Sequence, residues 1–320
     1  MERTLLALRY PLLGLLVLLL PFLIRSNYWI YMFTLVGIYI ILAGSLDLIY
    51  GYTGLASLGH GAFFGIGAYA CGILQVKLGY SIIPAIVLGT LFTCAFSALS
   101  GWPMLRIKGP YFALGTLAMG SMVTIVIHNW DSLTGGVSLS GIPLPPTIEF
   151  LGLRIDFSEK LPYYYLVYFF VFLSLFLIRR LNRSRLGRAF QAIRENGDLA
   201  EALGINILRY KLISFVIAST MAAFAGGLYA NYMGSIEPEI AGGHMSFNLL
   251  VMIVVGGART LTGEIVGPLL LWFLPEFLEA AVVYRPLFYG LVLLIVIILV
   301  PAGIGGKFRS LSPRLAKWIP

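Results

Sequence analysis

The residues that could carry out chemistry in this chain are few. None of the three histidines, His60, His128 and His244, has a second histidine or a carboxylate at metal-ligand spacing. No G-x-x-x-x-G-K-[ST] loop is present to hold nucleotide phosphates, and no nucleophile stands beside a base. The two cysteines, Cys71 and Cys94, fall inside apolar runs, where we expect packing rather than a disulfide. The sequence therefore predicts no catalytic residue, no cofactor and no metal site.

Three ionisable residues lie within or beside apolar runs. His60 follows Ser57 in a glycine-rich run, and a histidine surrounded by lipid is expected to face protein or a water-filled cavity. It either lines a path or bonds a nearby carbonyl, and the structural interpretation is favoured. Asp47 can accept hydrogen bonds from the GYTGL loop that follows it. Glu264 complements the dipole at the start of a helix that a preceding threonine can cap. The candidate caps are Thr260 and Thr262.

The longest polar segment runs from Arg179 to Lys211 and holds eight of the 22 Lys and Arg. Within it, apolar residues recur at i, i+3, i+4 and i+7, which predicts a helix with one apolar face. These residues are Leu186, Ala189, Phe190 and Ile193. A folded element is favoured here over an ordinary basic loop bound to anionic lipid headgroups.

A second short helix is predicted after the break at Asn196-Gly197. Asp198 can cap its start, and Glu201, three residues later, can complete a capping box. Gly204 can end it. We expect the two short helices to lie parallel to a membrane.

The composition indicates that lipid is the main solvent of this chain. Of 320 residues, 59% are hydrophobic and 11% are charged, whereas about 25% of an average soluble domain is charged. The mean hydropathy is +0.91. One polytopic membrane domain over 1–320 is a better prediction than the two or three soluble domains that the length allows. The net charge of +8 lies mostly beside apolar runs, so it indicates membrane orientation rather than nucleic-acid binding.

Ten apolar segments are predicted, and eight or nine spans remain possible if a broken segment is re-entrant. The first follows two arginines and lacks a small-x-small cleavage site, so we expect a retained span rather than a signal peptide. The segments are 10–24, 29–49, 55–75, 82–105, 111–127, 162–178, 212–232, 247–255, 265–283 and 287–300.

The charges favour one orientation of these segments. With ten crossings, the predicted inner regions are both termini, the turn at Arg106 and the stretch 179–211, and they hold 16 of the 22 Lys and Arg. The loop 128–160 falls outside and has more acidic than basic residues. This asymmetry is typical of a cell-membrane protein with both termini in the cytoplasm.

Two of the segments, 55–75 and 247–255, contain or run into glycine-rich breaks in corresponding places of the two halves. Such a pair is typical of an inverted repeat with a path between the halves. Glycines that only let helices pack closely are an equally good explanation.

Three long motifs, in this order, resemble one family of membrane proteins. They are GYTGLASLGHGAFFGIGAYA, RLGRAFQAIRENGDLAEALGINILRYKLISFVIASTMAAFAGGLYA and VVGGARTLTGEIVGP. They make the chain similar, over roughly residues 35–300, to the branched-chain amino acid ABC transporter permeases. More narrowly, it resembles the permease with the G-L-x-S-L-G-H-[GA]-A-F-F-G-I-G-A-Y signature.

The resemblance implies an all-α fold similar to that of the vitamin B12 importer permease, with about ten helices. It also implies assembly with a second, homologous permease, with ABC ATPase subunits that hydrolyse the ATP, and with an extracytoplasmic substrate-binding protein. In that family the segment matching Asp198 to Gly204 docks on the ATPase. The residues expected to couple to it are Arg188, Arg194, Glu195, Asp198, Glu201, Ala202 and Gly204.

The substrate path is expected to use backbone polar groups that are freed where the helices break. The candidate residues are Ser57, Gly59, His60, Gly61, Gly256 and Gly257. Outside the membrane, acidic residues can pair with a basic surface of the binding protein; they are Glu149, Asp156, Glu237 and Glu239. The substrate class includes branched-chain and other amino acids, with urea or short amides as an alternative. An ion-coupled secondary transporter and a channel are further alternatives, and the scarcity of acidic residues within the spans disfavours the former.

Overall fold

The computed structural model describes residues 17, 20–21, 26–107, 109–145, 147–150, 153–157, 159–277, 290, 294, 298 and 303–306. The predicted spans 10–24 and 287–300 and the basic tail lie almost wholly outside the described residues.

The described chain is mainly helical, as predicted. The long helices are α3 (Asn27–Asp47), α5 (Ile82–Met104), α6 (Pro110–Asn129), α8 (Lys160–Asn182) and α11 (Ile207–Met233). A five-residue π-helix, η1 (Leu48–Tyr52), continues α3. The shorter helices are α4 (His60–Val76), α7 (Asp131–Thr134), α9 (Arg185–Glu195), α10 (Gly197–Ala202), the 3₁₀-helix η2 (Pro238–Ala241), α12 (Gly243–Gly256) and α13 (Leu261–Phe277). The strands are β1 (Leu139–Ser140), β2 (Thr147–Phe150), β3 (Leu153–Asp156) and β4 (Ser235–Ile236).

Five of these helices are long and apolar enough to cross a membrane, and α4, α12 and α13 are shorter apolar helices. The prediction of an all-α polytopic membrane protein is therefore confirmed, with two small two-stranded sheets added outside the helices. In the glycine-rich segment predicted over 55–75, Leu55 to Gly59 are not helical, and the helix begins at His60. The predicted segment 247–255 is longer than expected, since α12 begins at Gly243.

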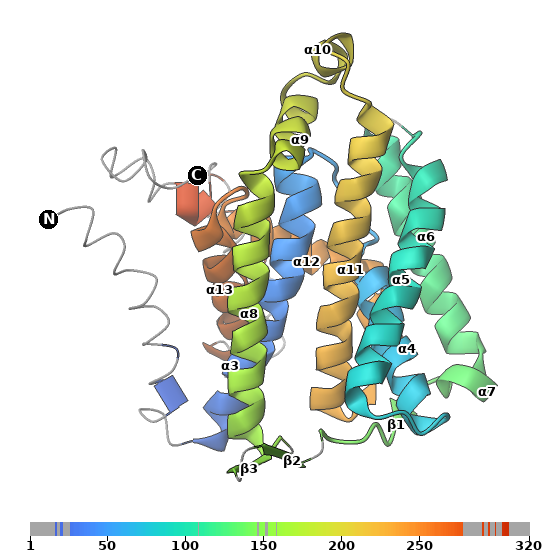
Figure 1. The fold of residues 1–320 in the computed structure, drawn as a ribbon, viewed down its shortest axis with the longest axis vertical. Coiled ribbons are helices and arrows are strands. Elements are labelled where there is room, and N and C mark those ends of the chain that lie inside the picture. The colour runs from blue at the N-terminus through green and yellow to red at the C-terminus, as the bar shows by residue number, and fades with distance from the viewer. Residues whose placement is uncertain are drawn as a thin grey trace, which may run out of the picture.

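Helix α3 is the centre of the bundle. Most of its membrane-length window is buried, and it contacts α8, α11, α12 and α13. Helices α4 and α5 pack against α11 on the other side (Figure 1). In contrast, α5 and α6 keep most of their apolar side chains exposed, as expected of helices that face lipid or another subunit.

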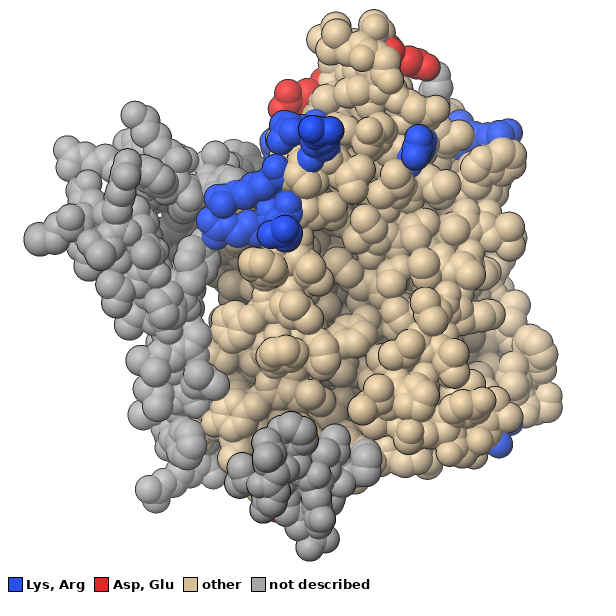
Figure 2. All heavy atoms as spheres, viewed as in Figure 1, with Lys and Arg blue, Asp and Glu red and all other residues tan. Residues whose placement is uncertain are grey.

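The polar segments lie at opposite ends of this bundle. Figure 1 shows α9 and α10 beyond one end of α8 and α11, and β1, β2 and β3 at the other end, where β4 pairs with β1. Strand β1 in the loop 128–160 pairs with β4 after α11, which ties the two loops together. Figure 2 shows Lys and Arg concentrated at the α9 end, whereas the long sides of the bundle are free of charged residues in this view. This distribution fits a membrane around the uncharged sides.

Glycines bring α4 and α11 into backbone contact. A Cβ atom added to Gly226 would lie 2.1 Å from the carbonyl oxygen of Phe64, and one added to Gly67 would lie 2.3 Å from that of Ala223. Neither carbonyl can move without disturbing its helix, so any side chain here separates the two helices. Close approach of this kind is how helices associate where lipid removes the hydrophobic drive.

We expect Gly226→Ala to destabilise the protein by about 1–3 kcal/mol, because the methyl group overpacks the α4–α11 contact. Gly115→Ala in α6 is the matched control, since its Cβ would meet only flexible side-chain atoms at 3.4 Å or more. Thermal unfolding of both purified variants in detergent measures the difference. Equal melting temperatures would contradict the assigned role of Gly226.

Candidate functional site

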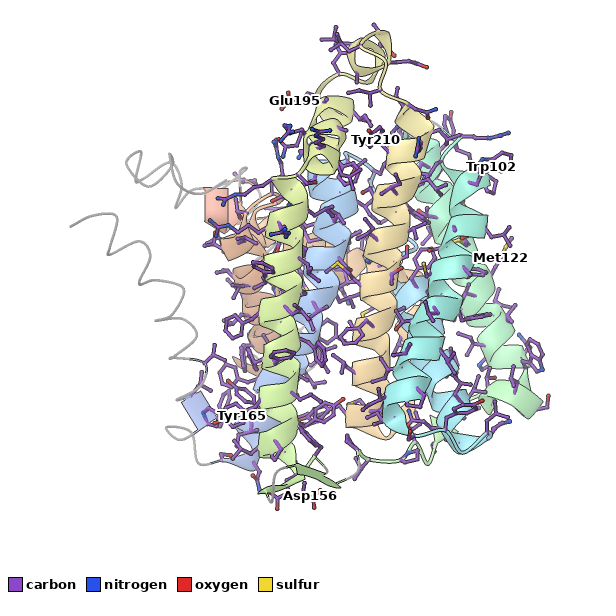
Figure 3. The ribbon with its side chains drawn as sticks, viewed as in Figure 1. Trp102, Met122, Asp156, Tyr165, Glu195 and Tyr210 are labelled. Atoms are coloured by element: carbon purple, nitrogen blue, oxygen red, sulfur yellow. The ribbon has the colours of Figure 1, made fainter. Side chains whose placement is uncertain are left out.

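Helix α9 is held against the bundle by the predicted apolar face. Ala189, Phe190 and Ile193 are buried, and Leu186 packs partly buried against the core, so this prediction is confirmed. Ser184 caps the helix, because its hydroxyl oxygen accepts hydrogen bonds from the N–H groups of Leu186 and Gly187. Figure 3 shows Tyr210 of α11 beside α9, and its ring meets that of Phe190 edge to face.

The predicted capping box of α10 is wrong. Asn196 caps the helix, with its side-chain oxygen accepting from the N–H of Leu199 at 3.0 Å, while Asp198 lies inside the first turn. Asn196 and Asp198 are both residue types that cap helices, and they stand two positions apart. Asn196 is the cap because its backbone is extended, as an N-cap residue requires. Gly204 ends the helix as predicted, with a φ of 86° and with the N–H of Ile205 bonding the carbonyl of Ala200.

Helix α10 forms the tip of the molecule, beyond α9 (Figure 1). All seven residues predicted to couple to an ATPase are exposed, but the guanidinium of Arg194 is partly covered. Two neighbouring residues, Leu199 and Leu203, were not predicted from the sequence. Their side chains are 58% and 75% exposed at this short polar helix. Leucines on a helix that has no core to cover were the available signal.

Arg194 differs from the other residues of this group because it reaches back into the bundle. Its guanidinium donates a hydrogen bond to the carbonyl of Gly51 in η1. Its side-chain stem lies against Gly54, where an added Cβ would be 2.9 Å from the Arg194 Cγ. Partial burial, followed by the nearby charge of Arg259, lowers the pKa of Arg194. Arg194 therefore joins α9 to the end of α3.

Asp47, one turn before Gly51, joins the same end of α3 to the turn between α12 and α13. Both of its carboxylate oxygens accept from the backbone N–H of Arg259, at 3.2 and 2.9 Å. The predicted partner was the loop after Asp47, and this prediction is wrong. Arg259 has a φ of 65°, a left-handed conformation that is costly for a residue with a side chain. The two hydrogen bonds help to hold it there.

The carboxyl group of Glu264 is also buried at this end of α3. Glu264 is 2% exposed, neither of its oxygens has a hydrogen-bond partner among the described residues, and one oxygen lies 3.3 Å from where a Gly44 Cβ would be. The predicted threonine cap is confirmed for Thr260, whose hydroxyl accepts from the N–H of Gly263 at 3.0 Å.

His60 starts α4 and is fully buried. Its Nε2 lies 2.8 Å from the hydroxyl of Ser45 in α3, and this hydroxyl also lies 2.6 Å from the carbonyl of Leu42. The surroundings thus match the structural interpretation of His60, with a hydroxyl in place of the expected carbonyl. Ser57 is also fully buried, and its hydroxyl has no hydrogen-bond partner within the described residues.

The glycines on either side of His60 meet two other helices. The N–H of Gly61 donates to the hydroxyl of Ser246 in α12 at 2.8 Å. A Cβ added to Gly59 would lie 2.1 Å from the carbonyl of Thr116 in α6, and the Thr116 hydroxyl accepts from the N–H of Leu58 at 3.0 Å. The start of α4 is therefore fixed between α6 and α12.

The second glycine pair, Gly256 and Gly257, packs against backbone as well. A Cβ added to Gly256 would lie 2.2 Å from the carbonyl of Gly263. Gly257 has a φ of 104°, and a Cβ added to Gly303 would meet its Cα at 2.3 Å. Both glycine-rich breaks thus serve close packing in this structure, and they lie on different elements of the bundle.

A cavity of about 270 Å³ lies at the end of the bundle that carries the strands. It is lined partly by stacked tyrosine rings, with Tyr232 5.5 Å from Tyr31 and 5.1 Å from Tyr163. None of the six residues predicted for the substrate path lines this cavity.

Apolar helices with uncharged sides and a charged pair of short helices at one end define a polytopic membrane protein. The chain belongs to the family described as the branched-chain amino acid transport system permease component, whose model matches residues 28–301. It is a permease subunit and is not itself an enzyme.

Several characterised permeases are similar to this chain. It is 34% identical to the high-affinity branched-chain amino acid transport system permease protein LivM of Escherichia coli K12, over 85% of this chain and 68% of that protein. It is 28% identical to LivH of the same organism, over 86% of this chain and 93% of that protein. BraD of Pseudomonas aeruginosa is also 28% identical, with coverage of 84% and 92%. No solved structure matches the chain.

We expect Ser45→Ala to destabilise the fold by about 1–3 kcal/mol, because it leaves the buried His60 Nε2 without a partner. Ser121→Ala on the exposed side of α6 is the control, since within the described part of the chain its hydroxyl bonds only the carbonyl of Leu117, one turn earlier. Thermal unfolding of both variants provides the measurement. A Ser45→Ala protein as stable as the control would rule out a structural bond between Ser45 and His60.

Proposed function

We propose that this chain is a transmembrane subunit of a binding-protein-dependent ABC importer that carries branched-chain amino acids into the cell, driven by ATP hydrolysis in a partner ATPase. The observation that carries the proposal is the tip of α10. There, Leu199 and Leu203 are exposed beyond the bundle, next to acidic residues. The relatives' names support the substrate class.

The shape of the tip fits a protein partner better than lipid. Its helix is capped at both ends, by Asn196 and by Gly204, so it offers a preformed surface. Asp198 and Glu201 give it a negative character that anionic lipid headgroups would repel. A preformed knob with apolar side chains in a polar setting is suited to a groove on a soluble partner.

The sidedness of the proposal follows from charge. The α9–α10 end carries most of the described Lys and Arg, which favours the cytoplasm, and Arg106 stacks on Trp102 at 3.7 Å near the same end (Figure 3). We place both termini there as well, in an inner membrane, with ten spans and an inverted repeat like that of the vitamin B12 importer permease. The stretch 179–211 would then be the cytoplasmic coupling stretch, and the loop 128–160 would face outward.

The proposed partners follow from this orientation. Similarity to both LivM and LivH, two permeases of one organism, supports pairing with a second homologous permease. A substrate-binding protein would dock at the strand end, where the side chains of Glu237 and Glu239 are exposed. The path past Ser57, Gly59, His60, Gly61, Gly256 and Gly257 remains a proposal. We propose that these residues, by the way α4 and α12 pack, set the shape of the helix breaks along which the substrate passes.

We expect Leu203→Asp to abolish co-purification of the ATPase and to reduce ATP-driven amino acid uptake at least tenfold, because the change removes an apolar contact at the tip. Val137→Asp is the matched control, since it is equally exposed, at 75%, but lies in the loop 128–160 at the other end. It is expected to keep the ATPase bound. Retained binding in Leu203→Asp would refute α10 as the docking element.

Reconstitution distinguishes the importer from the alternatives. Vesicles containing the permease pair, the ATPase and the binding protein are expected to accumulate leucine only when ATP is hydrolysed. Uptake without ATP would indicate a channel, and uptake that follows an ion gradient would indicate a secondary transporter. Uptake of urea or a short amide in place of leucine would reassign the substrate.

A further inference from the structure

The inner end of α3 connects three parts of the molecule that are distant in sequence. It carries Asp47, which bonds the turn at Arg259, and Gly51, which accepts from Arg194 of α9. A Cβ added to Gly51 would lie 2.1 Å from an oxygen of Asp47, so these two contacts share one compact site. Through Arg194, α9 is therefore in direct contact with this site.

The π-helix η1 gives this site its form. It adds a wide turn after α3. The N–H of Leu55 then donates to the carbonyl of Ile49 at 3.0 Å, which holds the following segment against η1. Thr53 is fixed from the side by Ser214 of α11, at 2.7 Å between the hydroxyl oxygens. Turns of this kind, inserted into otherwise regular helices, are frequent at functional sites.

The segment after η1 leads directly to the broken start of α4. Gly54 lies under the stem of Arg194, with a φ of 78° that favours glycine. Four residues later Leu58 is bonded to Thr116 of α6, and Gly61 to Ser246 of α12. This connection is short and is bonded at both ends, so it is suited to passing a displacement at Gly51 and Gly54 to α6 and α12.

We propose that Arg194 is a positioning residue that passes the movement of α9 and α10 into the end of α3, and from there into the segment 53–59 and, through Asp47, into the α12–α13 turn. This inference rests on the proposed function for the source of the movement. It reassigns Arg194, which the sequence placed among the residues that meet the ATPase, to a contact inside the permease.

The first test needs no partner protein. In purified Arg194→Gln, hydrogen exchange of the backbone amides in the segment 53–59 is expected to be at least fivefold faster than in the unmodified chain. Arg188→Gln is the control, because Arg188 is exposed on the same helix and, among the described residues, its guanidinium bonds only the carbonyl of Arg183. Unchanged exchange in Arg194→Gln would overturn the proposal, whatever the partners of the chain are.

The second test uses the assembled transporter. Arg194→Gln leaves Leu199 and Leu203 in place, so the ATPase is expected to co-purify while the amino acid imported per ATP hydrolysed falls at least fivefold. If the ATPase is lost, Arg194 contacts the partner directly, and the proposal is wrong. If the ATPase fails to bind the unmodified chain, the proposed function is wrong instead.

A disulfide can replace the contact between Arg194 and Gly54 and so test whether that contact restores coupling. A Cβ at position 54 would lie 3.4 Å from the Cβ of Arg194, close to the spacing of a disulfide-bonded pair. In a Cys94→Ser background, Gly54→Cys combined with Arg194→Cys is expected to import poorly when reduced and to regain coupling when oxidised. Gly54→Cys alone is the control and is expected not to respond to oxidation. Because a φ of 78° strains any side chain at position 54, import by the Gly54→Cys control is needed to show that the variant folds. With that control met, failure of the oxidised pair to recover would show that the contact does not transmit movement.

Discussion

A bilayer gives no water to buried polar groups, so each of them must find a partner within the protein. Helix α3 is the element on which this constraint falls most heavily, because nearly all of it is buried and it carries Thr34, Ser45 and Asp47. Thr34 bonds its own helix, at the carbonyl of Ile30. Ser45 and Asp47 bond other elements, and through them α3 sets the positions of α4 and of the α12–α13 turn.

Glycine makes these contacts possible. Where α4 meets α11, and where Gly256 meets Gly263, backbones approach to distances that no side chain allows. Such close contact excludes lipid and compensates for the missing hydrophobic drive between helices. The glycine-rich breaks are therefore rigid joints as well as interruptions, and a rigid joint is suited to passing on a displacement.

The two ends of the bundle are built for different contacts. At one end, two short capped helices have different contacts. Arg194 of α9 bonds Gly51 after α3, and Leu199 and Leu203 at α10 are exposed. At the other end, paired strands tie the loop 128–160 to the end of α11 beside a cavity with stacked tyrosines. The long helix α8 connects the two ends directly (Figure 1).

The sequence by itself determined the all-α membrane fold, the places of the long helices, the apolar face of α9 and the stop at Gly204. These features depend on local composition, on helical periodicity and on the conformational freedom of one glycine, all of which can be read along the chain. The cap at Asn196 was also local, but two suitable residues competed and only the backbone conformation separated them.

Only the tertiary structure decided the partners of the buried polar residues. Asp47 bonds Arg259, which is 212 positions away, and Arg194 bonds Gly51, 143 positions away. No periodicity links such pairs, since their distance depends on how five or more helices pack. The same reason explains why Arg194, an ordinary member of a basic run in the sequence, stands apart from its neighbours in the folded protein.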